Sequence, residues 1–235
     1  MDISNYWDDI DVRLEKLVKE GSVKLPPLDF FNLSAIAKNI SDDMNGKTFS
    51  ELCPSHEAFL QELNLEEHLT PKLYEIARNL LGYKGELANQ YHIARRVEPG
   101  NSKELYRAHF DSHLFTLVLP LKIPLAQKGG SVGDLIYFPN ARRKPKNEVS
   151  NFLGKVYYKK YASKEGLDDF ANNHTKLTDD FQDYSPLLFM GNTTLHTNKG
   201  VSIDCSSYRL TLLAHFFDPS PKYGVGGLAR LLRAR

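Results

Sequence analysis

Residues 106–124 read YRAHFDSHLFTLVLPLKIP and place a charged cluster directly before an apolar run. His109 and Asp111 are two positions apart, so in an extended chain their side chains point to the same side. The run 114–124 is rich in Leu, Val, Ile and Phe, which is typical of a buried β-strand. The segment therefore predicts a strand that begins next to an imidazole and a carboxylate, which together could hold a divalent metal.

Several other short runs of apolar residues have the same character. Gly, Pro, Asn and Asp separate these runs, as expected for turns between strands. The predicted strands cover residues 90–97, 114–124, 132–139, 152–158, 186–191 and 208–217. The polar stretch 162–183 is interpreted as a helix and loop inserted between strands. This pattern indicates an antiparallel sandwich or barrel.

The first 85 residues have a helical pattern instead. Apolar residues between Trp7 and Val18 recur at three- and four-residue steps, and Gly21 follows where a helix would end. Residues 28–44 form a second candidate helix, and Thr70-Pro71 begins a third. The expected fold class is mainly β with a helical N-terminal layer. We expect one domain over 1–235, with the helical layer at 1–85, the β core at 86–218 and a C-terminal tail at 219–235.

The composition narrows the class of protein. The chain has 235 residues and a formal net charge of +1, which argues against a dedicated nucleic-acid binder. Its two cysteines match no zinc or redox spacing. Residues 1–12 lack the basic and apolar regions of a signal peptide, and the apolar stretch 114–126 is too short to span a bilayer. These features predict a cytoplasmic protein with reduced thiols.

Two further residues extend the candidate metal site. His196 lies far downstream of the His109-x-Asp111 pair, and Arg209 begins the last predicted strand. Two histidines and one carboxylate are the ligand set of non-haem Fe(II) oxygenases, which leaves coordination positions open. A keto acid could occupy two of them, and the planar guanidinium of Arg209 suits its far carboxylate. Thr211, on the same side of that strand, could add a hydroxyl.

His109-Phe110-Asp111, His196 and Arg209, in that order around a β core, resemble the Fe(II)/2-oxoglutarate-dependent dioxygenases. The similarity is closest to the branch of phytanoyl-CoA hydroxylases or prolyl hydroxylases. This resemblance implies a double-stranded β-helix (a jelly-roll, cupin-like core) with Fe(II) on the two histidines and the aspartate. It also implies 2-oxoglutarate bound by Arg209 and Thr211, O₂ as the other co-substrate, and hydroxylation with release of succinate and CO₂.

Two other classes of function use the same residues. A cupin-like hydrolase or isomerase could hold Zn(II) or Mn(II) on these ligands, although it would give Arg209 no task. A non-catalytic jelly-roll binding module could keep a saturated structural metal, with His113 as its fourth ligand. We expect a structural or substrate-facing role for His113, and a core position for His215.

Basic residues outside this site predict the kind of substrate. Arg142 and Arg143 begin a basic loop, which could bind an anionic small molecule or a lipid- or sugar-linked substrate, or could simply be solvated. The tail carries Arg230, Arg233 and Arg235 beside leucines and could contact a membrane surface. The sequence leaves the primary substrate and the oligomeric state open.

Overall fold

The computed structural model describes residues 3–51, 53–101, 105–127, 129–145 and 148–219. The basic C-terminal tail, for which the sequence suggests a membrane contact, therefore lies outside the described residues. Within the described residues, no helix is both long and apolar enough to cross a membrane.

In the part of the chain that the structure describes, nine strands form two antiparallel sheets. The larger sheet has the order β1-β7-β4-β9-β3-β2, and the smaller has the order β6-β5-β8. The strands are β1 (Ser22–Lys24), β2 (Phe49–Ser50), β3 (Gln90–Val97), β4 (Phe115–Lys122), β5 (Leu135–Phe138), β6 (Leu177–Asp179), β7 (Leu187–Phe189), β8 (Leu195–Asn198) and β9 (Arg209–Phe216). The predicted mainly antiparallel β core with helices is confirmed.

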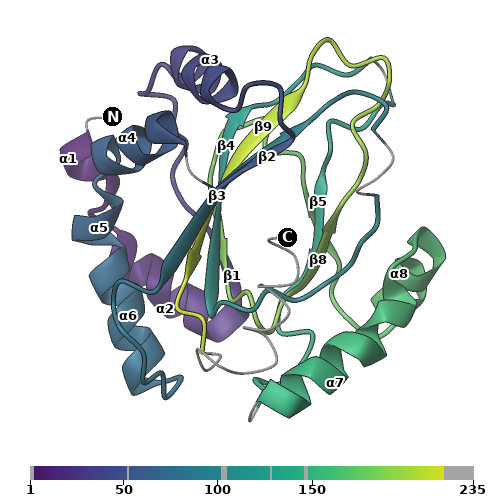
Figure 1. Cartoon of the computed structure of the whole chain (residues 1–235). Coiled ribbons are helices and arrows are strands. Elements are labelled where there is room, and N and C mark those ends of the chain that lie inside the picture. Colours follow the sequence, from purple (N-terminus) through teal and green to yellow (C-terminus); the bar gives the residue numbers. More distant parts are fainter. Residues whose placement is uncertain (1–2, 52, 102–104, 128, 146–147, 220–235) are drawn as a thin grey trace.

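Helices lie on both sides of this core. Those before β3 cover one face of the larger sheet, while β5 and β8 lie on its other side with the later helices beyond them (Figure 1). The helices are α1 (Ile3–Tyr6), α2 (Ile10–Glu20), α3 (Leu33–Asp43), α4 (Pro54–Glu62), α5 (Leu65–His68), α6 (Thr70–Asn79), α7 (Glu148–Tyr158) and α8 (Lys164–Ala171), with a 3₁₀ turn η1 (Lys159–Tyr161).

The N-terminal helices follow their sequence signals. α2 ends where Gly21 adopts a left-handed conformation (φ 82°), in which glycine has no steric penalty. Asn32 caps α3, because its side chain accepts a hydrogen bond from the Ala35 amide. α6 begins at Thr70, with Pro71 in its first turn. The layer also contributes β1 and β2, two short strands that the sequence did not predict, to the larger sheet.

The two faces of the larger sheet have different partners. Leu119 and Leu212 belong to the same buried cluster as Leu17 of α2 and Leu73 of α6. Val118 and Leu213 point the opposite way and pack with side chains of β5. Side chains alternate between the faces of a strand, so each strand presents one residue set to the helices and another to the smaller sheet. We call the side toward the smaller sheet the inner face.

One predicted strand is wrong, and both β6 and β8 of the smaller sheet were missed. β6 pairs with β5 but lies in the polar stretch 162–183, for which the sequence predicts a helix and loop. Residues 152–158 belong to helix α7, in which Tyr158 packs its ring against Phe110 and Phe170. Aromatic and β-branched residues favour strands locally, but packing outweighs this preference here. β8 was not predicted, because only four residues of mixed polarity form it. Its pairing with β5 defines it as a strand.

Burial of His92 makes stability depend on pH. Its ring lies between the sheet and the helices, near Phe216. Burial, helped by the nearby His56 and His215, lowers the pKa of His92 to about 4 from its ordinary value of 6.5. The unfolded chain therefore takes up a proton at a higher pH than the folded protein does. The contribution of the neutral ring to the free energy of unfolding is complete above pH 6.5 and is lost as the pH falls toward 4.

We expect the free energy of unfolding to decrease by about 3 kcal/mol between pH 6.5 and pH 4 because of His92. Urea unfolding of the wild type and of His92→Leu at several pH values measures this contribution. The variant should lose that part of the pH dependence, and His174→Leu, a change outside the sheet, should keep it. An identical pH profile for His92→Leu and the wild type would contradict the assignment.

Candidate metal centre

The structure brings the three predicted ligands together. The backbones of His109 and His196 form an isolated antiparallel bridge, with both N···O distances 3.0 Å. This bridge joins the segment before β4 to β8. One ligand atom from each of His109, Asp111 and His196 lies within 4.8 Å of the others. The Nε2 atoms of both histidines are 3.6 Å from Oδ1 of Asp111.

Backbone carbonyls orient the two imidazole rings. Nδ1 of His109 lies 2.8 Å from the carbonyl oxygen of Arg107, and Nδ1 of His196 lies 3.2 Å from that of Thr194. A carbonyl oxygen can only accept, so each Nδ1 carries the hydrogen that it donates. Each Nε2 consequently keeps its lone pair and faces the carboxylate. Such a hydrogen bond is the usual partner of a metal-binding histidine.

The second oxygen of Asp111 is held from the sheet. The Thr116 hydroxyl donates to Oδ2 over 2.5 Å, and Nδ1 of His215 lies 3.8 Å from the same oxygen. The Asp111 amide also donates to the Gly191 carbonyl at 3.0 Å. Asp111 therefore presents Oδ1 to the histidines, while Oδ2 is bound to the protein.

The charge states suit a cation. Burial alone would raise the pKa of the Asp111 carboxyl, but the adjacent His196, His109 and His215 outweigh it and hold this pKa well below its usual range. Burial also lowers the pKa of His196 to about 4. Near neutral pH the carboxylate is thus ionised and His196 is neutral. Two imidazole nitrogens and one carboxylate oxygen fit Fe(II) in an open site.

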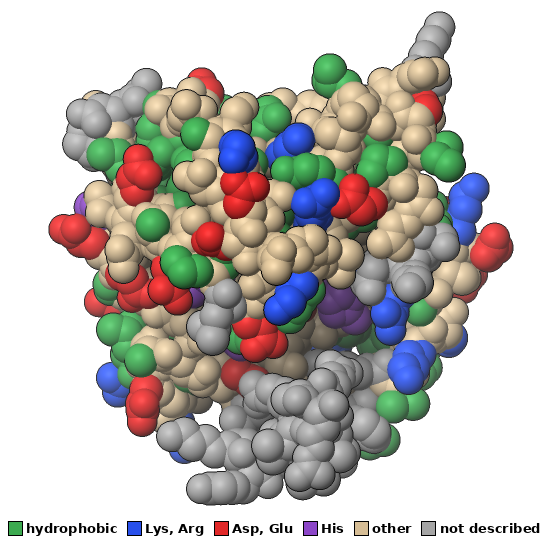
Figure 2. All heavy atoms as spheres, turned by 45° about the horizontal axis from the view of Figure 1, so that its top comes forward, with side chains coloured by type: hydrophobic (Ala, Val, Ile, Leu, Met, Phe, Trp, Pro, Cys, Tyr) green, Lys and Arg blue, Asp and Glu red, His purple; other side chains and the backbone are tan. Residues whose placement is uncertain are grey.

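The centre is buried on one side and open on the other. The side chains of Asp111 and His196 are 10% exposed, whereas that of His109 is 54% exposed. Phe189 of β7 packs against the His196 ring, with centroids 4.9 Å apart. On the face shown in Figure 2, histidine side chains reach the surface near Lys and Arg side chains. A small molecule can therefore approach the ligands from the His109 side.

Arg209 and Thr211 lie on the inner face of β9. Arg209 is only 4% exposed; it donates to the Gly133 carbonyl and lies over the Phe181 ring. Its Nε has no hydrogen-bond partner among the described residues, and no described carboxylate forms an ion pair with it. Burial lowers the pKa of Arg209 to about 10. A guanidinium this buried requires an anion or further acceptors.

The other candidate residues have different surroundings. The rings of His113 and His215 stack at 5.1 Å, and His113 does not belong to the three-residue cluster of ligand atoms found among the described residues. His215 occupies the expected core position, close to the Thr116 hydroxyl.

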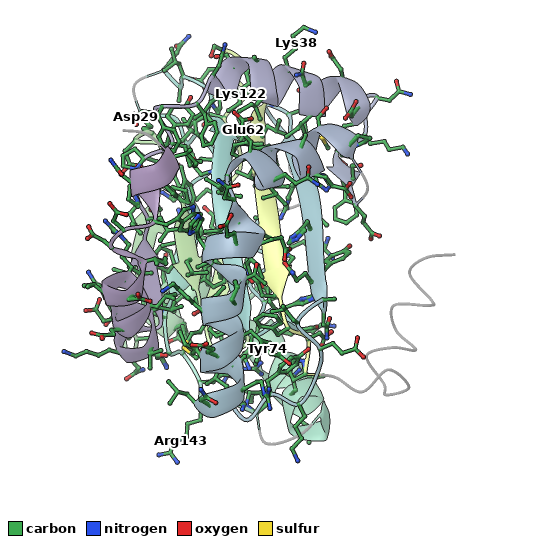
Figure 3. All side chains as sticks on the ribbon, turned by 90° about the vertical axis from the view of Figure 1, so that its left-hand side faces the viewer. Asp29, Lys38, Glu62, Tyr74, Lys122 and Arg143 are labelled. Atoms are coloured by element: carbon green, nitrogen blue, oxygen red, sulfur yellow. The ribbon has the colours of Figure 1, made fainter. Side chains whose placement is uncertain are left out.

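The predicted substrate residues Arg142 and Arg143 differ from each other. Arg142 donates to the Asn192 carbonyl and to the Asn151 side chain, and lies over the Phe110 ring, so its contacts stabilise the fold around α7. Arg143 projects into solvent (Figure 3). A role for either in substrate binding stays a prediction.

Sequence reasoning missed Thr116. The alternation of side chains in β4 marks it as a polar residue on the inner face of an apolar strand. That signal indicates a buried hydroxyl that a partner would stabilise, but only the folded structure shows that Asp111 is the partner.

Several solved structures have a fold similar to that of this chain. Prolyl 4-hydroxylases from Phytophthora capsici have a TM-score of 0.56 at 14% identity, with 99% of this chain and 73% of theirs covered. A Pseudomonas putida prolyl-4-hydroxylase has 0.50 at 12% identity, covering 92% of this chain and 98% of its own. The non-heme alpha ketoglutarate dependent carbocyclase SnoK from nogalamycin biosynthesis has a TM-score of 0.51 at 12% identity, with 93% of this chain and 89% of SnoK covered.

These similarities confirm the expected resemblance at the level of the fold, which is that of the 2-oxoglutarate-dependent oxygenases. No protein-family model and no curated protein matches the chain. The similar structures include both hydroxylases and a carbocyclase, so the fold by itself does not identify the reaction.

We expect Thr116→Val to weaken metal binding by about tenfold, because groups that orient a metal ligand contribute 10- to 100-fold to affinity. Calorimetric titration with Mn(II) measures the change, and Thr116→Ser, which keeps the hydroxyl, should retain most of the affinity. Thr70→Val is the matched control, since Thr70 is buried in α6 with no hydrogen-bond partner for its hydroxyl among the described residues. Equal affinities in Thr116→Val and Thr70→Val would contradict the role of Thr116.

Proposed function

Since the chain has the fold of these oxygenases and carries a His-Asp-His cluster, we propose that it is an Fe(II)- and 2-oxoglutarate-dependent oxygenase. Its reaction is the hydroxylation of a primary substrate, with conversion of 2-oxoglutarate to succinate and CO₂. One observation carries the proposal: the same fold holds this open cluster of three ligands and a buried arginine. That arginine, Arg209, has no ion-pair partner among the described carboxylates.

Each residue has a distinct task in this proposal. His109, Asp111 and His196 hold Fe(II) through the atoms that already face one another. Arg209 binds the distal carboxylate of 2-oxoglutarate, with the Thr211 hydroxyl from the same face of β9 as a further donor. When bound, Fe(II) together with 2-oxoglutarate and O₂ supplies the oxidising power that amino-acid side chains lack.

The inner face provides an apolar wall beside these polar groups. Val118, Leu187, Phe189 and Leu213 belong to one cluster between the two sheets. Phe189 contacts the His196 ring and shields it from water. Exclusion of water strengthens the interaction between Arg209 and a carboxylate, because the local dielectric constant is low. This wall therefore supports a site for an organic anion deep in the fold.

The strand order supports the finer interpretation of the core as a double-stranded β-helix. β4 and β7 belong to the larger sheet, and β5 and β6, which lie between them in the chain, belong to the smaller sheet. β8 then joins the smaller sheet and β9 the larger one. The chain thus alternates between two facing sheets, as in a jelly roll.

Turnover of the co-substrate tests the proposed class. Metal-stripped protein supplied with Fe(II), ascorbate, O₂ and 2-oxoglutarate should form succinate without an added primary substrate. Asp111→Ala should abolish this activity, because the site loses the carboxylate among its three assigned ligands. Asp204→Ala, which removes an exposed carboxylate, should retain it. Wild-type rates in Asp111→Ala would exclude the assigned ligands.

Arg209 tests the co-substrate separately. We expect Arg209→Leu to raise the KM for 2-oxoglutarate by about 10- to 100-fold, as expected for loss of a buried charge-assisted pair. Affinity for Mn(II), measured by calorimetry, should remain within about twofold of the wild type, because Arg209 does not contact the metal ligands. An unchanged KM would show that the keto acid binds elsewhere.

A further inference from the structure

The Thr116 hydroxyl, which donates to Asp111, has a second polar neighbour on the next strand of the larger sheet. Thr116 of β4 is directly opposite His215 of β9, and Nδ1 of His215 lies 3.1 Å from the hydroxyl oxygen. Both side chains belong to residues that are buried. His215 is therefore one hydrogen bond further from the candidate metal site than Thr116 is.

The direction of this second hydrogen bond follows from the number of hydrogens. A threonine hydroxyl has one hydrogen, and an ionised carboxylate can only accept. The 2.5 Å contact with Oδ2 of Asp111 therefore uses the hydroxyl hydrogen of Thr116. Nδ1 of His215 must then carry a hydrogen of its own and donate it to the hydroxyl oxygen. This direction is the same for a neutral and for a protonated imidazole.

Neighbouring rings hold the imidazole of His215 in place. The rings of His113 and Tyr91 both stack on it, with centroids 5.1 Å and 6.0 Å from its own. Tyr91 is directly opposite His215 on β3, and its hydroxyl donates to Glu51. Since stacking limits the rotation of the imidazole, Nδ1 stays next to the Thr116 hydroxyl.

A glycine provides the space for this arrangement. The Gly191 carbonyl accepts a hydrogen bond from the Asp111 amide, which brings the backbone after β7 close to the site. A Cβ atom at Gly191 would lie 2.8 Å from the Thr116 hydroxyl oxygen and 3.0 Å from Cβ of Asp111. A residue with a side chain would therefore displace the threonine or the aspartate, and glycine permits the close approach.

We propose that His215 is a positioning residue of the metal centre, because its Nδ1–H directs the hydroxyl hydrogen of Thr116 toward Asp111. A hydroxyl can rotate, and a donor on one side of its oxygen leaves its hydrogen for an acceptor on the other side. Hydrogen bonds in such a chain also polarise and strengthen one another. The inference rests on the proposed function, which assigns the metal to Asp111 and the two ligand histidines.

A double-mutant cycle tests the inference without turnover, through calorimetric titration of the full chain with Mn(II). The proteins are the wild type, His215→Leu, Thr116→Val and the variant with both changes. We expect His215→Leu to weaken Mn(II) binding by about fivefold, as for the loss of one hydrogen bond. In the Thr116→Val background the same change should have an effect below about twofold, because the hydroxyl through which His215 acts is absent.

Two single variants serve as matched controls. An asparagine amide nitrogen can take the place of Nδ1 as a donor, so His215→Asn should bind Mn(II) within about twofold of the wild type. His92 is opposite Ala214, whose side chain faces the helices, so His92→Leu changes a buried histidine on the other face of the sheet and should retain the wild-type affinity.

The outcomes separate this inference from the proposed function. Wild-type affinity in His215→Leu, or an equal loss with and without the Thr116 hydroxyl, would overturn the role of His215. A wild-type protein that does not bind Mn(II) would overturn the metal centre and the proposed function with it.

Nitrogen NMR of the metal-free wild type locates the hydrogen itself, so the inference can be tested even where a variant does not fold. At about pH 8 imidazole rings are neutral, and the nitrogen chemical shifts show which ring nitrogen carries the hydrogen. We expect His215, assigned through its backbone correlations, to carry the hydrogen on Nδ1. A hydrogen on Nε2 instead would overturn the proposal.

Discussion

Two backbone hydrogen bonds between His109 and His196 join segments that are far apart in the chain. They fix the approach of both imidazole rings, and Asp111 follows two residues after His109 on the same side. The carbonyls that orient the rings come from the same two segments. The candidate metal site is thus a consequence of strand pairing, and its geometry depends on main-chain groups that side-chain substitutions leave intact.

The two faces of the larger sheet differ in the kind of side chain that they bury. Its outer face packs mainly apolar side chains against the helices, and most of the buried apolar residues that the structure describes belong to this cluster. Its inner face carries Thr116, His215 and Arg209, whose burial is costly unless each has a partner. Because the outer face provides much of the folding free energy, the inner face can retain polar groups that a simple core would exclude.

The long strands and the candidate ligands could be predicted from the sequence for a physical reason. β4 and β9 are long and apolar, and β3 is equally long and carries Tyr, Ile and Val, with turn residues around all three, so local pattern alone marks them. The candidate ligands His109 and Asp111 are polar residues directly before an apolar strand, a combination that is typical of a binding site. Residues 152–158 were assigned wrongly, because their helix depends on packing against Phe110 and Phe170. The partner of Thr116 and the pairing of Arg95 with Thr211 follow from register, which no local pattern contains.

The Thr116 hydroxyl limits the number of oxygens that the Asp111 carboxylate can offer to a metal. A free carboxylate can bind a metal through one oxygen or through both, and the second mode removes a coordination position from substrates. Here Oδ2 is held by Thr116 and faces His215, which leaves Oδ1 alone to meet a metal. A six-coordinate metal would then keep three positions for other molecules, the number that a chelating keto acid and dioxygen together require. The stoichiometry that this site can support is therefore set by a hydroxyl group that never contacts the metal.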